Sequence, residues 1–179
     1  MRRGGCLARP RQEIGSTTMK LYFFRHGQAE DAQMPDFDDF TRELTDKGAE
    51  RVRAAGEALI RLGVKPACLY SSPRLRARQT AEVLGKVLGV EVIVREEVGF
   101  GFHVPIVESL IAGLDPRAEV MFVGHEPDLS ATVSALIGGG EIVMKKGGLA
   151  RVDISDERPL QGALVWMIAP RLFDCMAGH

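Results

Sequence analysis

Short apolar strands alternate with amphipathic helices along most of the chain, and this alternation restricts the fold more than any other feature. Strands are predicted at residues 20–25, 67–71, 91–94 and 119–123. Apolar runs of this length, bounded by glycine and polar residues, are typical of strands buried within a sheet. Strands that alternate with helices predict an α/β domain whose helices cover both faces of a mostly parallel sheet.

Helix signals lie between these strands. The predicted helices cover residues 45–62, 73–88, 106–114 and 127–137. Thr45 suits an N-cap and Pro73 a first helical turn, while Gly63 and Gly89 suit helix ends.

Two late strands follow the last of these helices. They are predicted at residues 149–154 and 163–168, joined by a turn that contains Asp156 and Pro159. Strands joined by a short turn pair antiparallel. We therefore expect a mixed sheet within a three-layer sandwich.

The first 18 residues differ in charge from the rest. Four arginines against Glu13 give this segment a net charge of +3, whereas residues 19–179 carry 19 basic and 23 acidic residues, a net charge of −4. The segment has no apolar periodicity and lacks the apolar stretch of a secretory signal. We expect residues 1–18 to be a disordered extension or the product of a start codon assigned too early, and residues 19–179 to form a single domain.

The composition of the whole chain excludes several classes of protein. Its 23 basic and 24 acidic residues lack the basic excess of a nucleic-acid binder. No apolar run approaches the ~18 residues that cross a membrane. The three cysteines, Cys6, Cys68 and Cys175, form no disulfide or metal-binding pattern, so cytoplasmic surroundings are expected.

Residues suited to binding phosphate follow three of the predicted strands. They are Arg25-His26-Gly27, Ser72-Pro73-Arg74-Leu75-Arg76 and Gly124-His125-Glu126. Ligands bind beyond the carboxyl ends of parallel strands, so these segments meet if their strands are neighbours. Guanidinium groups match phosphate oxygens, and an imidazole can attack phosphorus. The sequence therefore predicts a phosphate pocket.

The same segments resemble the histidine phosphatase superfamily, which includes the phosphoglycerate mutases. The resemblance is carried by RHG at residues 25–27, LTDKG at 44–48, SPRLRARQT at 72–80 and VGH at 123–125, and it covers nearly all of residues 19–169. The chain has no room for the insertions of the mutases, so it is most similar to the small SixA-like phosphohistidine phosphatases. The resemblance implies a phosphoglycerate mutase-like fold and a phosphatase that needs no metal or other cofactor.

The resemblance also implies roles for individual residues. His26 is the expected nucleophile, Arg25 and Arg76 bind the phosphoryl oxygens, and His125 completes the pocket. Further phosphate or substrate contacts are expected from Gly27, Gln28, Ser72, Arg74 and Glu126. His103 and His179 receive no role. The expected partner is a phosphorylated protein or a small phosphorylated substrate, and the protein itself is expected to be a monomer or weak oligomer.

A general acid has no clear match in the sequence. Glu30, Glu97 and Glu126 are candidates by location only. A phosphohistidine substrate reduces this need, because its imidazole leaving group can depart already protonated. We therefore expect dephosphorylation of phosphohistidine on a signalling or phosphotransfer protein, with a small-molecule phosphate monoesterase as the alternative.

Two other functions must be compared with this one. Cys68 and Arg74 have the C-x5-R spacing of cysteine-dependent phosphatases, but the residues between them include no glycine to form a tight phosphate loop. A non-catalytic phosphate-binding module is the remaining alternative. It is disfavoured because both histidines and both arginines of the expected site are present.

Overall fold

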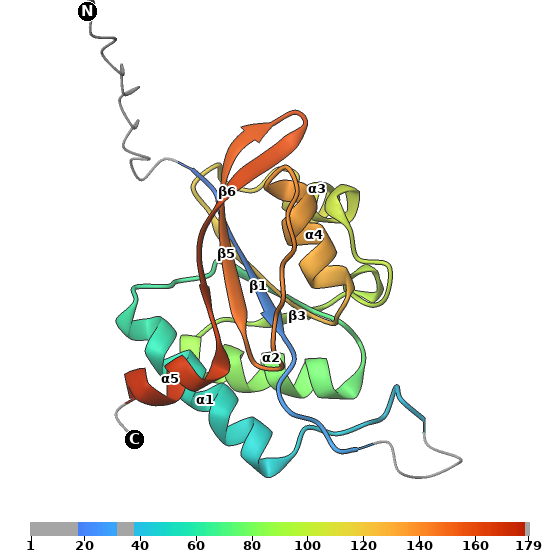
Figure 1. The fold of residues 1–179 in the computed structure, drawn as a ribbon, viewed down its shortest axis with the longest axis vertical. Coiled ribbons are helices and arrows are strands. Elements are labelled where there is room, and N and C mark those ends of the chain that lie inside the picture. The colour runs from blue at the N-terminus through green and yellow to red at the C-terminus, as the bar shows by residue number, and fades with distance from the viewer. Residues whose placement is uncertain (1–17, 32–37, 178–179) are drawn as a thin grey trace, which may run out of the picture.

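The computed structural model describes residues 18–31 and 38–177. Apart from Thr18, the expected N-terminal extension lies outside the described residues, as do Cys6 and His179. Figure 1 shows a central sheet with helices on both faces, as expected. None of the described helices is both long and apolar enough to cross a membrane.

The sheet has six strands in the order β3-β2-β4-β1-β5-β6. They are β1 (Lys20–Arg25), β2 (Cys68–Ser71), β3 (Val92–Val94), β4 (Glu119–Gly124), β5 (Leu149–Glu157) and β6 (Leu160–Ile168). The first four pair in parallel, and β5 joins β1 and β6 antiparallel. The predicted mixed, mostly parallel sheet is therefore confirmed, and it places the three phosphate-binding segments on neighbouring strands.

Two apolar cores explain the three layers. In β1, Leu21 and Phe23 face the core beneath α3 (Val104–Ile111) and α4 (Asp128–Leu136). Tyr22 and Phe24 face the opposite core, beneath α1 (Asp46–Arg61), α2 (Leu75–Leu88) and α5 (Pro170–Ala177). A strand buried on both faces has a continuous apolar sequence instead of an alternating one, which accounts for the run in β1.

The start of α1 shows how local sequence fixes the structure beside the expected site. Thr45 is the N-cap, and its Oγ1 accepts a hydrogen bond from the Gly48 amide at 3.0 Å. The Thr45 amide and hydroxyl both donate to the Gln28 carbonyl, at 3.0 and 3.1 Å. A Cβ at Gly48 would lie 2.1 Å from that carbonyl oxygen, so only glycine permits this approach. The LTDKG motif therefore supports the loop that follows His26.

Several predicted boundaries are wrong. Helix α2 begins at Leu75 with Arg74 as its N-cap, so Pro73 precedes the helix. Helix α3 covers Val104–Ile111 instead of 106–114, because Pro105 is compatible with the first turn, where no amide donor is required. Strands β5 and β6 extend further than predicted, and Asp156 lies within β5.

Helix α5 has no counterpart among the predicted elements. It covers Pro170–Ala177 and packs against α1, with Phe173 buried in the core. Two turns of helix after a strand give too short a pattern to distinguish from a C-terminal loop.

Candidate active site

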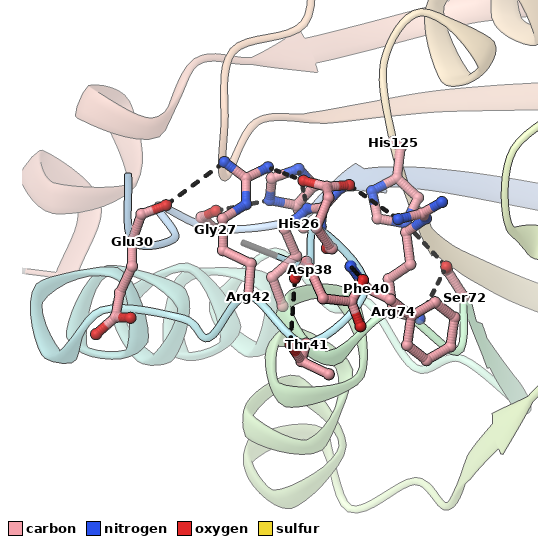
Figure 2. Close-up of polar contacts among 12 residues, drawn as sticks. His26, Gly27, Glu30, Asp38, Phe40, Thr41, Arg42, Ser72, Arg74 and His125 are labelled. Carbon is pink, nitrogen blue, oxygen red and sulfur yellow. Dashed lines mark hydrogen bonds and ion pairs between the residues drawn. The ribbon is translucent and has the colours of Figure 1, made fainter. Parts of the chain in front are cut away.

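The carboxyl ends of β1, β2 and β4 meet at one edge of the sheet. Arg25 is paired with Gly124, and Ser71 with Val123. Beyond the strands, the His26 amide donates to the Gly124 carbonyl at 3.1 Å, and the Ser72 amide donates to the Val123 carbonyl at 3.0 Å. The rings of His26 and His125 lie 5.2 Å apart between centroids. The expected convergence of the two histidines is therefore present, as Figure 2 shows.

His26 is held with one ring nitrogen toward the pocket. Its Nδ1 lies 2.8 Å from the Gly27 carbonyl, which can only accept, so Nδ1 carries the proton. The Nε atom of Arg76 donates to His26 Nε2 at 3.3 Å, so Nε2 offers a lone pair. The ring is 4% exposed, and burial lowers its pKa to about 3, helped by the charges of Arg76 and Arg25. A neutral imidazole whose Nε2 is unprotonated is the form that attacks phosphorus, once the Nε2 lone pair is released from the Arg76 hydrogen bond.

His125 lies against the loop that follows β2. Its Nε2 is 2.8 Å from Ser72 Oγ, and among the described residues its buried Nδ1 has no hydrogen-bond partner. The residue is 2% exposed. Burial lowers its pKa to about 2, and the neighbouring His26 and Arg76 act in the same direction. His125 is therefore a neutral polar group whose buried Nδ1 is unpartnered among the described residues.

Arg76 connects His26 to an acidic residue that the sequence analysis did not identify. Besides its contact with His26, its Nη1 donates to the Asp39 carbonyl at 2.6 Å and its Nη2 to Asp39 Oδ2 at 3.1 Å. The side chain is 3% exposed, and burial lowers its pKa. Asp39 therefore fixes the plane of the guanidinium beside His26.

Asp39 is shared among three arginines. Arg74 Nη1 contacts Oδ2 at 2.8 Å, and Arg42 Nη2 contacts Oδ1 at 3.0 Å. Arg42 was also missed, although its charge lowers the pKa of both His26 and His125. Its proximity to the LTDKG motif is the one sequence signal that could have identified it.

Arg25 occupies the other side of the pocket. Its Nη1 donates to the Met144 carbonyl at 2.7 Å, and its buried Nε has no partner among the described residues. Burial lowers its pKa, and the negative charge of Glu126 opposes this effect. The pocket therefore combines a neutral imidazole, that of His26, with guanidinium groups from three separate segments, an arrangement suited to a tetrahedral dianion.

The SPRLRARQT motif also supports the loop after β1. Thr80 Oγ1 accepts from the Gly27 amide at 3.0 Å and donates to the Arg76 carbonyl at 2.7 Å. Gln79 Oε1 accepts from the Leu44 amide at 2.6 Å. These contacts link α2 to Gly27 and to Leu44, which lie before and after Asp39 and Arg42 in the chain.

The candidate acids lie in different places. Glu30 and Glu97 are exposed, and Figure 2 shows the Glu30 carboxylate pointing away from the histidines. Glu126 accepts from Ser130 Oγ at 2.5 Å, while its other oxygen is buried without a partner among the described residues. Of the three, Glu126 alone is close enough to Arg25 to affect its pKa.

Other predicted residues are placed as follows. Gly27 and Gln28 line a cavity of about 420 Å³ with Arg25 and Lys145, so Gln28 lies beside Arg25. His103 is exposed and contacts its own loop at Gly101. No group of three or more His, Cys, Asp or Glu in the described part of the chain could hold a metal ion.

The Cys68–Arg74 alternative fails on geometry. Cys68 begins β2, and Ser71 ends it at the edge where the histidines lie. Three residue steps along the strand separate these positions by about 10 Å. The thiol is therefore at the opposite end of the strand from the phosphate-binding residues.

Sequence comparison identifies the class of protein that this site defines. Residues 21–99 match the model of the histidine phosphatase superfamily (branch 1). An uncharacterised protein of Picosynechococcus sp. is 36% identical over 140 residues, which cover 73% of this chain and 82% of that protein. The chain belongs to the histidine phosphatase superfamily and is a phosphatase of that class.

Solved structures place it further within that class. The protein histidine phosphatase SixA in complex with tungstate matches with a TM-score of 0.75 and 28% identity, over 86% of this chain and 99% of that one. The chain assigned as SixA in Agrobacterium tumefaciens matches with a TM-score of 0.70 and 26% identity, over 84% and 98%. A mycobacterial glucosyl-3-phosphoglycerate phosphatase, at 20% identity and a TM-score of 0.66 over 84% and 99%, shares the fold alone. The chain is SixA-like.

Proposed function

We propose that this phosphatase removes the phosphoryl group from phosphohistidine on a signalling or phosphotransfer protein, with His26 as the nucleophile. The observation that carries the proposal is the state of His26. Its Nδ1–H is bound by the Gly27 carbonyl, and its Nε2 lone pair faces Arg76. The ring is ready to form a bond to phosphorus without first losing a proton.

In the first step, the Arg76 Nε–H turns from His26 Nε2 to a phosphoryl oxygen, and the released Nε2 lone pair attacks phosphorus. The bond between phosphorus and the substrate nitrogen breaks, and its electron pair returns to the substrate imidazole. If the other nitrogen of that ring already holds a proton, it leaves as neutral imidazole. Arg25, Arg76 and the His125 Nδ1 side of the pocket stabilise the charge on the transferring oxygens.

In the second step, water attacks phosphorus and the bond to His26 Nε2 breaks. The electron pair returns to Nε2, and the water proton is carried away by the phosphate product. The Gly27 carbonyl holds Nδ1–H throughout, so the ring keeps one orientation in both steps. Positioning and fixed charge therefore supply most of the catalysis.

The placement of the acids supports phosphohistidine over phosphate esters. An ester releases an alkoxide, which requires a proton donor. Both oxygens of Asp39 are occupied by arginines, Glu30 and Glu97 are exposed, and Glu126 accepts from Ser130 Oγ and lies near Arg25. An imidazole leaving group does not require such a donor, so this substrate fits the side chains that are present.

The test is a substrate panel with matched variants. A phosphohistidine protein, a phosphoserine peptide and a sugar phosphate are incubated with wild type, His26→Ala and Cys68→Ser. We expect phosphohistidine to be hydrolysed fastest, His26→Ala to lose activity, and Cys68→Ser to keep it. Faster turnover of the sugar phosphate, with none of phosphohistidine, would refute the proposed substrate.

Trapping the intermediate separates an enzyme from a binding module. Labelled phospho-donor is mixed with the protein and quenched in alkaline denaturant, where a phosphohistidine bond survives. A label on wild type that is absent from His26→Ala supports the nucleophile. A phosphate-binding module would carry no label in either protein.

A further inference from the structure

Two phenylalanine side chains are exposed at the mouth of the phosphate pocket. Phe40 is 43% exposed and Phe100 is 56% exposed. They come from loops 60 residues apart, one beside Asp39 and the other after the short 3-10 helix at Glu96–Val98. Single exposed apolar residues are common on protein surfaces. Two aromatic rings that approach the same charged side chain at a catalytic pocket require a more specific explanation.

Backbone hydrogen bonds anchor the two loops that carry these rings. The Phe40 carbonyl accepts from the Leu75 amide at 3.0 Å, which ties this loop to the start of α2. On either side of Phe100, the Gly99 amide donates to the Glu96 carbonyl at 2.9 Å and the Gly101 amide donates to Asp128 Oδ2 at 3.0 Å. Each ring is thus presented to solvent by an anchored loop.

Both rings lie against Arg74. Its guanidinium carbon is 3.9 Å from the Phe100 ring centroid and 5.6 Å from that of Phe40. Phe100 also lies 5.4 Å from the His125 ring. Figure 2 shows Phe40 and Arg74 side by side near His125 and Ser72. The aromatic surface therefore adjoins the phosphate pocket directly.

We infer that Phe40, Arg74 and Phe100 form a leaving-group subsite that binds a planar ring attached to the transferring phosphoryl group. Aromatic faces and a guanidinium plane favour flat π systems over flexible polar chains. The imidazole of phosphohistidine is such a flat π system. The inference therefore rests on the proposed function, and it adds the residues that select the leaving group of that reaction. Arg74 and the two rings are specificity residues, distinct from the groups around phosphorus.

The experiment uses four substrates that vary two properties separately. Phosphoimidazole and phosphoramidate contain P–N bonds with and without a ring. Phenyl phosphate and ethyl phosphate contain P–O bonds with and without a ring. The kcat/KM ratio of ring to ringless substrate is measured for wild type, Phe100→Leu, Phe40→Leu and the ring-retaining Phe100→Tyr. Ile60→Ala, which alters an equally exposed apolar residue on α1, is the control.

We expect the ring-to-ringless ratio to fall about tenfold in Phe100→Leu and less in Phe40→Leu, because Phe100 has the closer contact with Arg74. Phe100→Tyr and Ile60→Ala are expected to keep the wild-type ratio. An unchanged ratio in both Leu variants would overturn the inference. This holds if the rates for ring and ringless substrates fall equally, as expected for residues that only support Arg74, and also if neither rate changes.

The panel also distinguishes this failure from failure of the proposed function. If wild type prefers both P–O substrates to both P–N substrates, the phosphohistidine assignment is wrong. The phenyl-to-ethyl phosphate ratio still reports on the subsite in that case, and a fall in Phe100→Leu supports it. Thermal unfolding of each variant verifies that the compared proteins are folded.

Discussion

Mild acid is expected to destabilise this protein through its two pocket histidines. Burial lowers the pKa of His26 to about 3 and that of His125 to about 2, from an ordinary value of 6.5. At pH ~5 both rings therefore stay neutral in the folded protein, while both take up a proton in the unfolded chain. Because the unfolded state binds more protons, stability is complete above pH ~6.5 and decreases as the pH falls toward about 3.

The magnitude follows from the size of the pKa difference. Each pH unit below about 6.5 costs ~1.36 kcal/mol per histidine until the folded-state pKa is reached. At pH ~5 this amounts to about 2 kcal/mol for each ring and about 4 kcal/mol for both. Since whole domains are stable by roughly 5–15 kcal/mol, the loss is a large fraction of the total.

Urea denaturation at pH ~7.5 and pH ~5 measures this effect. The free energy of unfolding is compared for wild type, the double variant His26→Gln/His125→Gln, and His103→Gln as a control on the exposed loop. We expect wild type and His103→Gln to lose about 4 kcal/mol more than the double variant between these two pH values. Phosphate is omitted from the buffers because it would bind the folded state.

An equal loss of stability in wild type and in the double variant would refute this reasoning, because groups other than the two histidines would then account for the acid sensitivity. A second measurement applies if the double variant does not fold. NMR titration of the wild-type imidazoles would contradict the argument if either ring became protonated near pH ~6.5.

Three further predictions concern the residues around the nucleophile. Thr45→Ala is expected to lower the free energy of unfolding by about 1 kcal/mol through loss of the α1 N-cap, with Thr45→Ser close to wild type, as measured by urea denaturation. Gly48→Ala is expected to reduce kcat strongly, because its Cβ would lie 2.1 Å from the Gln28 carbonyl and displace the loop after His26; wild-type kinetics would contradict this. Asp39→Asn is expected to tighten inhibition by inorganic phosphate about tenfold, because it removes a negative charge beside Arg76 but keeps the contact between Arg76 and the backbone carbonyl of residue 39. Weaker inhibition would instead show that the charge is needed to position the arginines.

Local sequence patterns were sufficient to predict the strands and the edge where the site lies. The buried runs of β1 and β4 are continuous and apolar. His26 directly follows β1 and His125 directly follows β4, so strand and site residues could be predicted together. The parallel pairing of β2, β4 and β1 then brought His26, Ser72 and His125 to one place without further information.

Residues of the 38–42 segment could not be predicted in the same way. Asp39 and Arg42 lie in a polar stretch without apolar periodicity, and charged residues in such a stretch are usually solvated. Asp39 contacts Arg74 and Arg76, which are more than 30 residues away along the chain, and Arg42 joins this cluster through its ion pair with Asp39. Phe40 and Phe100 were missed for the same reason, since each is an isolated apolar residue in its own loop.

Because the two pocket histidines are neutral, the net charge of the pocket is set by its arginines and carboxylates. With His26 and His125 uncharged, the fixed charges of the phosphate pocket and of the subsite at its mouth are those of Arg25, Arg42, Arg74 and Arg76 on one side and Asp39 and Glu126 on the other. Four positive and two negative groups leave a net charge of +2, which matches a phosphoryl dianion. Asp39 thus reduces an excess that would otherwise hold phosphate too tightly for release, while fixing Arg76 beside the nucleophile. The whole-chain charge of −1 conceals this local balance.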